Sequence, residues 1–326
     1  MSGKTPMSNR QTPQDSEKIQ ESRTAPDFSR FNVCDSYCNP ITDSKPPGAA
    51  GEERRRISRQ QLEEIALRLS ERDTQVITSI QRYRYLMTGQ LQRLHFTDAA
   101  TPTAALRAAN RALKKLRELG LIDTLSRRIG GVRAGSGSLV WYITHAGERL
   151  IYLQAQALTP TKRFFEPSPY FLAHTLAVTE IAVQLTELCR ETPGLTLSAL
   201  QPEPECWRTY SEFGNILALK PDLFAITISG QYEDRWFLEV DLDTESPAKI
   251  IGKCEKYHKY YRSGLEQKEA EVFPLTVWIV PTAERKERLT AHIREAFEKQ
   301  PKLFTVITRD ELEHLIRCGG DGGALC

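Results

Sequence analysis

Residues 216–245, ILALKPDLFAITISGQYEDRWFLEVDLDTE, hold the pattern that most restricts how this chain can fold. Two apolar runs, Leu223–Ser229 and Trp236–Leu242, flank a polar turn that contains a glycine, which is the pattern of a β-hairpin. Side chains alternate along the second run, so Glu239 and Asp241 share one face of the strand. The stretch therefore predicts a hairpin with an acidic face as the central element of the second half of the chain.

The predicted hairpin brings a third carboxylate to that face. If its turn is centred near residue 231, Asp222 falls across from Glu239 or Asp241, and directly opposed residues share a face. Carboxylates grouped within roughly 5–8 Å destabilise one another unless a cation, a basic side chain or a proton intervenes. A hard divalent cation such as Mg²⁺ satisfies such a group. The pattern also fits an ordinary solvated acidic strand face, and the residues alone leave both interpretations open.

Length and composition indicate a globular protein with two domains. The 326 residues, 40% hydrophobic and 26% charged, are enough for two cores. No apolar run approaches the ~18–20 residues that a membrane span needs, and the N-terminal residues lack the apolar core of a signal peptide. We therefore expect a cytoplasmic protein without membrane contacts. The seven cysteines lack the paired spacing of a disulfide framework or a zinc site.

Composition also divides the chain along its length. Residues 1–57 are rich in Ser, Thr, Pro, Gln, Asn and charge, and they cannot bury enough apolar surface to offset the entropy lost on ordering. We expect this segment to be a disordered tail. A proline-containing linker near residues 160–169 separates two further regions, so we predict one domain over residues 58–158 and another over residues 168–318.

Residues 58–158 predict several helices followed by a hairpin. Ser58, Asp73 and Thr88 are placed to begin three helices, and a fourth, long helix covers Thr103–Leu119. The expected core side of the long helix is Leu106, Ala109, Leu113 and Leu116. Two short strands, residues 121–125 and 139–144, then flank a Gly-rich basic segment. This order is typical of a winged helix-turn-helix, whose recognition helix enters the major groove while the wing lies along the backbone.

Positive charge is concentrated in this first region, although the net charge of the chain is only +2. Between Pro102 and Arg133 eight Arg or Lys residues face only two acids. A basic helix alone is often just a solvated face, but here the helix order, the basic wing and the local charge agree, and they predict binding to double-stranded DNA. Most contacts would reach phosphates, which position a protein without reading sequence. The expected contact residues are Arg107, Arg111, Lys114, Lys115, Arg127, Arg128 and Arg133.

The second region alternates helices and strands. An amphipathic helix over His174–Arg190 precedes short strands and the central hairpin, and Ser246-Pro247 then begins another helix. A buried strand over residues 272–280, a helix, a strand and a closing helix follow. This order predicts an α/β sandwich around a mixed sheet.

That order, with its acidic hairpin, resembles the core of restriction-endonuclease-like (PD-(D/E)xK) nucleases. Pro221-Asp222 matches the "PD" of the family, and Glu239 matches the acid that follows it. Glu180 lies on a preceding helix, where many members keep a further carboxylate. The lysine expected two residues after the acid is replaced by Asp241.

The resemblance implies a catalytic group and a metal. In some members the lysine has moved to the next helix, where Lys253 (or Lys249) is the candidate here. The implied metal ligands for Mg²⁺ are Asp222, Glu239 and Asp241, with Lys253 stabilising developing charge and Glu180 as the additional carboxylate. Should the replacement by Asp241 abolish catalysis, the fold would remain as a binding module, because fold resemblance does not settle function.

Residues from about 70 to 315 also resemble the replication-relaxation family of plasmid and mobile-element proteins. The matching pieces, in order, are Arg72-Asp73 with LMTGQLQRLHF, the basic helix, Leu119-Gly120-Leu121, residues 144–147 (THAG), the HTLAVTE helix, KPD, and LEVDLDTE followed by Lys253 and Tyr257. The resemblance implies a DNA-binding accessory protein for plasmid replication or mobilisation, with plasmid replication or relaxase proteins as partners.

Two other functions stay open at this point. One is a metal-dependent DNA endonuclease or nickase that its winged helix directs to the target. The other is a winged-helix transcriptional regulator whose second domain senses a signal or dimerises.

Overall fold

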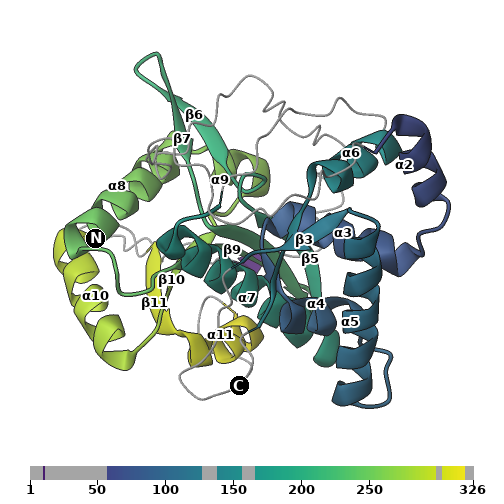
Figure 1. Ribbon diagram of the computed structural model, residues 1–326. Helices are drawn as coiled ribbons and strands as arrows, with labels where there is room; N and C mark the ends of the chain where they lie inside the picture. Colours follow the sequence, from purple (N-terminus) through teal and green to yellow (C-terminus); the bar gives the residue numbers. More distant parts are fainter. Residues whose placement is uncertain (1–9, 12–56, 127–137, 156–165, 299–302, 320–326) are drawn as a thin grey trace. The chain divides into compact units, whose positions relative to one another are not determined.

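The computed structural model describes residues 10–11, 57–126, 138–155, 166–298 and 303–319 (Figure 1). The chain divides into two compact units, an N-terminal unit of residues 23–172 and a C-terminal unit of residues 173–326 that also includes residues 1–22. Most of the predicted tail lies outside the described residues. So do Arg127, Arg128 and Arg133, the predicted contacts of the wing.

The N-terminal unit consists of helices around a small antiparallel sheet with strand order β2-β4-β3. Trp141 joins two of its elements, because its indole Nε1 donates a 2.9 Å hydrogen bond to Thr88 Oγ1 at the start of α4. The elements are α2 (Arg59–Ala66), α3 (Glu71–Tyr83), β2 (Leu86–Met87), α4 (Thr88–His95), α5 (Pro102–Glu118), β3 (Ile122–Thr124), β4 (Val140–Ile143) and α6 (His145–Gln154).

Local sequence explains most of these boundaries, with three corrections. Thr88 is the first residue of α4, so the N-cap is Met87 and not Thr88. Ser58 begins α2 with a capping box, as expected. The N-cap of α3 is Ser70 and not Asp73, because Asp73 occupies the third helical position and returns the capping bond. In α5 the buried stripe is Ala105, Ala109, Leu113 and Leu116. The predicted core residue Leu106 is 41% exposed, because it lies at the edge of that stripe, about 20° of helix rotation beyond Leu113 and about 100° from Ala105.

The C-terminal unit is built on a mixed sheet, as the sequence predicted. Its strand order is β11-β10-β9-β8-β5; β9, β10 and β11 are parallel, while β8 pairs antiparallel with both β9 and β5. Arg10–Gln11 (β1), within the predicted tail, pairs antiparallel with the start of β9. The other elements are α7 (Pro169–Glu191), β5 (Leu195–Pro202), β6 (Arg208–Glu212), β7 (Asn215–Leu219), β8 (Leu223–Ser229), β9 (Tyr232–Val240), α8 (Pro247–Ser263), α9 (Leu265–Ala270), β10 (Leu275–Val280), α10 (Ala283–Ala296), β11 (Phe304–Thr308) and α11 (Leu312–Cys318).

The predicted central hairpin is β8–β9, and its register fixes the candidate site. Ser229 faces Tyr232 across a two-residue turn, and Leu223 faces Leu238. Extending this register by one pair places Asp222 across from Glu239, which is one of the two pairings that the sequence allowed. Ser246 caps α8 with Pro247 in its first turn, also as expected.

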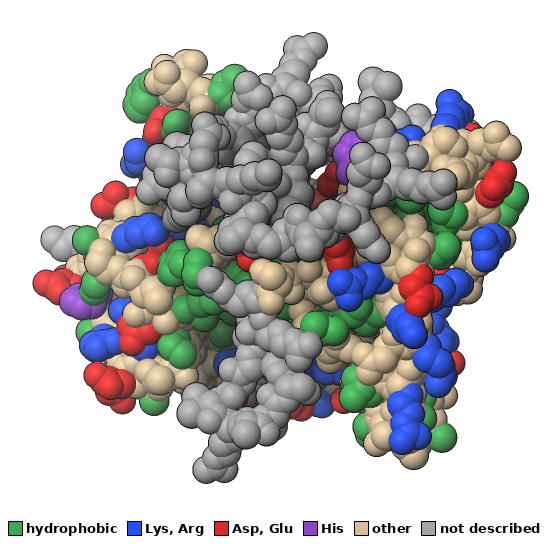
Figure 2. Space-filling view, viewed as in Figure 1, with side chains coloured by type: hydrophobic (Ala, Val, Ile, Leu, Met, Phe, Trp, Pro, Cys, Tyr) green, Lys and Arg blue, Asp and Glu red, His purple; other side chains and the backbone are tan. Residues whose placement is uncertain are grey.

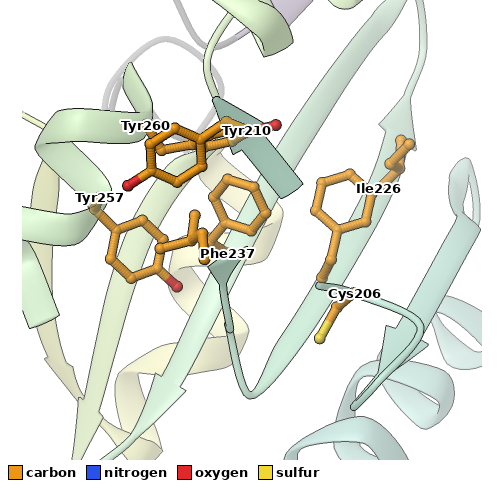
Figure 3. Packing of buried hydrophobic residues seen from close by; sticks show 8 residues of the cluster. Cys206, Tyr210, Ile226, Phe237, Tyr257 and Tyr260 are labelled. Atoms are coloured by element: carbon orange, nitrogen blue, oxygen red, sulfur yellow. The ribbon is translucent and has the colours of Figure 1, made fainter. Parts of the chain in front are cut away.

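An aromatic core joins this hairpin to α8 (Figure 3). The ring centroid of Phe237 lies 5.4 Å from that of Phe224 and 5.6 Å from that of Tyr257. Both Trp236 and Phe237 are fully buried, although their side chains point to opposite faces of β9. The sheet is therefore covered on both faces here, and Figure 1 shows α8 and α10 on one side and α7 on the other. None of the helices in the described ranges combines the length and apolar character needed to cross a bilayer.

The THAG segment, residues 144–147, gives a test of the N-terminal fold. Thr144 caps α6 by accepting from Gly147 N, and its hydroxyl donates to the Gly120 carbonyl at 2.6 Å. A Cβ on Gly147 would lie only 2.1 Å from the Leu121 carbonyl oxygen.

We therefore predict that Gly147→Ala lowers the free energy of unfolding by about 3 kcal/mol, because backbone must shift to admit the methyl group. The matched control is Gly89→Ala in α4, where a Cβ meets nothing within 4 Å. Helix propensity predicts a gain of up to about 1 kcal/mol for this control. Urea unfolding of both variants measures the difference, and equal stabilities would contradict the close approach of α6 to Leu121.

Candidate functional site

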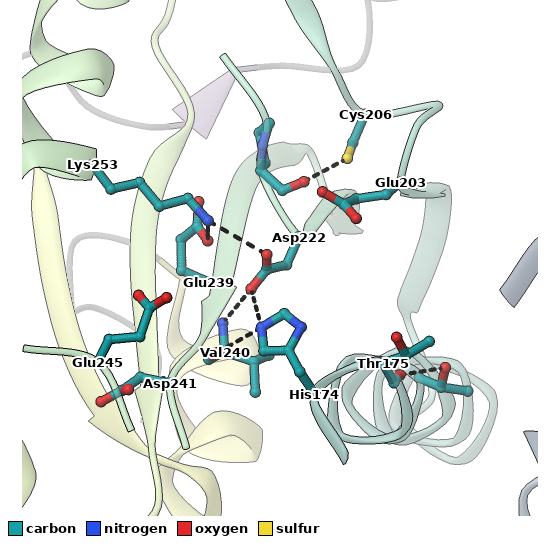
Figure 4. A network of polar contacts seen from close by, with 12 residues as sticks. His174, Thr175, Glu203, Cys206, Asp222, Glu239, Val240, Asp241, Glu245 and Lys253 are labelled. Atoms are coloured by element: carbon teal, nitrogen blue, oxygen red, sulfur yellow. Dashed lines mark hydrogen bonds and ion pairs between the residues drawn. The ribbon is translucent and has the colours of Figure 1, made fainter. Parts of the chain in front are cut away.

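Asp222 is the centre of a buried polar cluster at the end of the β8–β9 hairpin (Figure 4). It directly precedes β8 and is only 5% exposed. Its Oδ2 accepts a 2.8 Å hydrogen bond from Val240 N and lies 3.3 Å from His174 Nε2, while its Oδ1 lies 3.4 Å from Lys253 Nζ. Donors from three separate segments therefore hold this carboxylate in one orientation.

Glu239 faces Asp222 and is completely buried. Its Oε1 accepts from the Tyr257 hydroxyl, and its Oε2 accepts from Lys253 Nζ. Lys253 and Tyr257 are four residues apart on α8, so their side chains leave the same side of the helix. The interpretation as a solvated acidic strand face is wrong for these two carboxylates, because both are inside the protein.

The structure distinguishes between the two candidate lysines. Lys253 bridges Asp222 and Glu239 from α8. Lys249 is exposed one turn earlier and pairs with Glu245. Only Lys253 therefore occupies the position that the lysine of the nuclease motif would need beside the two acids.

Two predicted site residues lie elsewhere. Asp241 follows the last residue of β9, and its Oδ2 accepts from Arg285 Nε at 2.6 Å. The Arg285 side chain is 5% exposed and also donates to the Glu245 carbonyl, so Asp241 anchors the chain after β9 to α10. Glu180 accepts a 2.8 Å hydrogen bond from Arg309. The hydrogen bonds from Arg285 and Arg309 thus connect these acids to α10 and to the chain after β11.

His174 is the member of the cluster that our sequence analysis did not assign. Its Nε2 lies 3.1 Å from the Val240 carbonyl oxygen and 3.3 Å from Asp222 Oδ2. Both partners are acceptors, so Nε2 carries a proton in this arrangement. His174 begins the HTLAVTE segment, but a single histidine on an amphipathic helix gives no signal of its own. Its role depends on contacts with residues 48 and 66 positions away in the chain, Asp222 and Val240.

The charges within the cluster balance one another. Burial disfavours the charged imidazole, but the facing Asp222 carboxylate outweighs this and raises the pKa of His174 to about 9. Burial also opposes ionisation of Asp222, yet Lys253 and His174 hold its pKa well below the usual range. For Glu239 burial dominates and raises the pKa, although Lys253 and Tyr257 favour the carboxylate. The pKa of Lys253 is raised despite burial because two carboxylates face it.

The predicted magnesium ligands do not fit an ion as a trio, since Arg285 holds Asp241. Within the described residues, no three His, Cys, Asp or Glu side chains are arranged to bind a metal. A mixed donor set does converge, however: His174 Nε2 lies 3.1 Å from the Val240 carbonyl oxygen and 3.3 Å from Asp222 Oδ2. Neighbouring ligands of an octahedral Mg²⁺ with bonds of ~2.1 Å lie about 3 Å apart. Two of the three distances between these atoms match such a site, and an ion would have to displace the Nε2 proton.

The family model described as replication-relaxation matches residues 77–276, which is more than half of the chain. The chain belongs to the replication-relaxation family. The match includes α5 and all of β8, β9 and α8, so the basic helix and the acidic cluster both lie within the part of this protein that the family shares.

Other comparisons add little to the family assignment. No curated protein matches the chain. Among solved structures, the restriction endonuclease FokI bound to DNA is 10% identical, with 82% of this chain and 73% of that chain covered. Its TM-score of 0.23 is too low for this likeness to support an argument about function.

The buried pair of His174 and Asp222 predicts a pH-dependent stability. Because the folded-state pKa of His174 is raised, its stabilising contribution is fully present below pH ~6.5 and is lost as the pH rises to about 9. The His174 side chain is 30% exposed, so we expect a contribution of about 2 kcal/mol rather than the full value of the shift.

His174→Gln should therefore be less stable than the unaltered protein at pH 6, and the two should converge by pH 9.5. Chemical denaturation with a chelator present measures this difference across the range. His292→Gln, on the exposed side of α10, is the matched control and should track the unaltered protein at every pH. A difference for His174→Gln that stays constant with pH would contradict a charged imidazole beside Asp222.

Proposed function

We propose that this protein binds double-stranded DNA as an accessory protein in the replication or mobilisation of a plasmid or mobile element. The observation that carries the proposal is the exposed basic side of α5. Membership of the replication-relaxation family supports the connection to plasmid replication, with plasmid replication or relaxase proteins as further partners.

The basic side of α5 is available because the helix packs through its other side. Ala109, Leu113 and Leu116 are fully buried, while Arg107 and Arg111 are exposed and form no ion pair with another described residue. Lys114 continues the same side and lies 3.8 Å from Glu118. Figure 2 shows Lys and Arg side chains at the lower right, over α5. Such a row of cations gains free energy by releasing counterions from a phosphate backbone.

The remaining basic residues of α5 are partly neutralised. Lys115 Nζ lies 2.6 Å from Asp73, and Arg117 Nε lies 2.9 Å from Asp123. Lys115 therefore helps to attach α5 to α3 as well as adding positive charge. We expect its contribution to DNA affinity to be smaller than that of Arg107 or Arg111.

The order of elements in this unit supports a winged helix-turn-helix. Helices α3, α4 and α5 follow one another, and the antiparallel strands β3 and β4 come directly after α5. In that fold α5 is the recognition helix and the segment between β3 and β4 is the wing. A helix presented in this way contacts phosphates across the major groove and orients the protein on the duplex.

We predict that the double variant Arg107→Ala, Arg111→Ala binds duplex DNA more weakly and with a shallower salt dependence. The slope of log affinity against log salt should fall by about 1.8, since each phosphate contact contributes roughly 0.9. Arg294→Ala, an exposed arginine on α10, is the charge-matched control. Fluorescence anisotropy between 50 and 300 mM salt gives both slopes, and unchanged slopes would rule out α5 as the docking helix.

A second candidate function is a metal-dependent DNA endonuclease or nickase. The observation in its favour is the convergence of Asp222, Glu239 and Lys253, the residues that resemble the nuclease motif, beside the mixed donor set. His174, Asp222 and the Val240 carbonyl would hold the ion. A bound divalent cation would lower the pKa of a water ligand and neutralise a phosphate. Lys253 and Tyr257 would keep Glu239 in place beside Asp222.

Cleavage is tested by conversion of supercoiled plasmid to nicked or linear DNA with Mg²⁺, Mn²⁺ or EDTA. If this function is correct, metal-dependent conversion should fall at least 100-fold in Lys253→Met and Glu239→Gln and stay near the original rate in Lys249→Met. Thermal melts of each variant separate lost chemistry from lost folding. DNA binding without conversion supports the accessory function, and a sequence-specific footprint at a promoter without cleavage would instead support a transcriptional regulator.

A further inference from the structure

The C-terminal unit carries a hairpin outside its main sheet that the acidic cluster does not explain. Among the strands of the described residues, β6 and β7 pair only with each other, and Phe213 and Gly214 form the turn between them. Both turn residues have positive φ, 49° and 78°, the combination of a type I′ hairpin turn. Figure 1 shows the hairpin projecting from the unit beside α8.

The tip of this hairpin exposes large apolar side chains. Phe213 is 97% exposed and Ile216 is 75% exposed. Figure 2 shows hydrophobic side chains at this projecting end, at the upper left, with acidic and basic side chains beside them. A bulky residue with positive φ is unfavourable in the backbone, and exposing its whole ring adds no packing energy. Within the monomer Phe213 therefore gains nothing that a glycine or asparagine would not provide.

The base of the hairpin is firmly held, so the tip is presented on a fixed support. Tyr210 packs on Tyr260 of α8 with ring centroids 5.4 Å apart. Arg208 Nε donates a 2.8 Å hydrogen bond to Glu266. Cys206 Sγ donates to the Pro221 carbonyl at 2.9 Å, which closes the base of the hairpin. Its last strand ends at Leu219, three residues before Asp222, so the hairpin leads directly into the candidate site.

Basic side chains lie along this support, with the acids Glu203 and Glu205 at its base. Lys259 Nζ lies 3.8 Å from Glu212, the one acid between residues 208 and 219. Lys220, directly after β7, is exposed and places Nζ 4.0 Å from the Trp207 ring centroid. The exposed charged residues along this part of α8 are Glu255, Lys256, Lys259 and Arg262, three bases against one acid. An exposed aromatic ring at the tip, with lysines along α8 and at the base of the hairpin, matches a nucleic acid, which offers flat bases beside phosphates.

We infer that the β6–β7 hairpin is a second nucleic-acid contact, in which Phe213 stacks against a nucleobase while Lys220, Lys256 and Lys259 contact the phosphates. In duplex DNA the ring would enter a base step as an apolar wedge, and in single-stranded DNA it would stack on an unpaired base. The inference rests on the proposed DNA-binding function and deepens it, because it adds a contact at the tip of the hairpin whose base leads to Asp222. A second copy of this chain is the other conceivable occupant, but its equally basic α8 would repel this one.

The test compares Phe213→Ala with Phe213→Trp and with Thr209→Ala, a change on the exposed side of β6. Affinities are measured for a duplex and for a single strand of equal length. We expect Phe213→Ala to weaken binding roughly tenfold without changing the salt slope, because stacking and not a phosphate contact is lost. Phe213→Trp should retain affinity, and Thr209→Ala should bind like the unaltered protein. A larger loss of affinity for the duplex would indicate that Phe213 wedges into a base step, and a larger loss for the single strand would indicate stacking on an unpaired base.

The outcomes separate this inference from the proposed function. If Arg107→Ala, Arg111→Ala weakens binding while Phe213→Ala does not, the hairpin contact is wrong and DNA binding through α5 stands. If the unaltered protein binds neither DNA, both proposals fail. Sedimentation at increasing protein concentration tests whether the tip instead contacts a second copy of the chain. A dimer that Phe213→Ala abolishes, with DNA affinity unchanged, would assign the tip to a second copy of the chain and overturn the inference. Because Phe213 is exposed, its variants should melt at the same temperature as the original.

Discussion

The ion pairs that Lys253 makes with Asp222 and Glu239 are the interaction on which the C-terminal unit depends. Two carboxylates, one directly before β8 and one in β9, are buried at a sheet that is covered on both faces, and such charges are tolerated only with a partner. Lys253 brings that partner from α8, and the same helix supplies Tyr257 to both Glu239 and the aromatic core. The β8–β9 register places the two carboxylates side by side, and α8 must lie where Lys253 can neutralise them. A change in either the register or the position of α8 would leave a buried charge unpaired.

This dependence explains which parts of the site were predictable. The pairing of Asp222 with Glu239 follows from the two-residue period of a strand and the place of the turn, and both can be read locally. Lys253 was predictable only through the family resemblance, and choosing it over Lys249 required the packing of α8. His174 and Arg285 could not be predicted, because each meets its carboxylate partner across at least 44 residues of chain.

Asp241 and Leu106 lie elsewhere than predicted because in both cases a periodic sequence pattern was followed further than the packing supports. Asp241 was assigned to the acidic face because side-chain alternation was extended past the end of β9. The strand ends at Val240, and the Asp241 carboxylate accepts a hydrogen bond from Arg285. Leu106 was assigned to the core of α5 because it lies about 20° from Leu113 around the helix, and the position of the buried stripe, centred nearer Ala109 and Leu116, follows only from packing of α5 against α4 and β3. The mixed sheet, by contrast, follows from element order alone, since hairpin and crossover connections limit the possible pairings.

The acidic cluster is neutralised by residues of this protein, so its burial in the fold does not depend on any reaction that it catalyses. Lys253 and protonated His174 neutralise the cluster without an external cation, so the fold does not require a metal in order to bury Asp222 and Glu239. A divalent ion would have to compete with the Nε2 proton of His174 for the space between Asp222 and Val240. Metal affinity at this site should therefore increase with pH, because a raised imidazole pKa strengthens that competition near neutrality. Burial of the cluster is therefore compatible with the proposed DNA-binding function whether or not a metal is bound there.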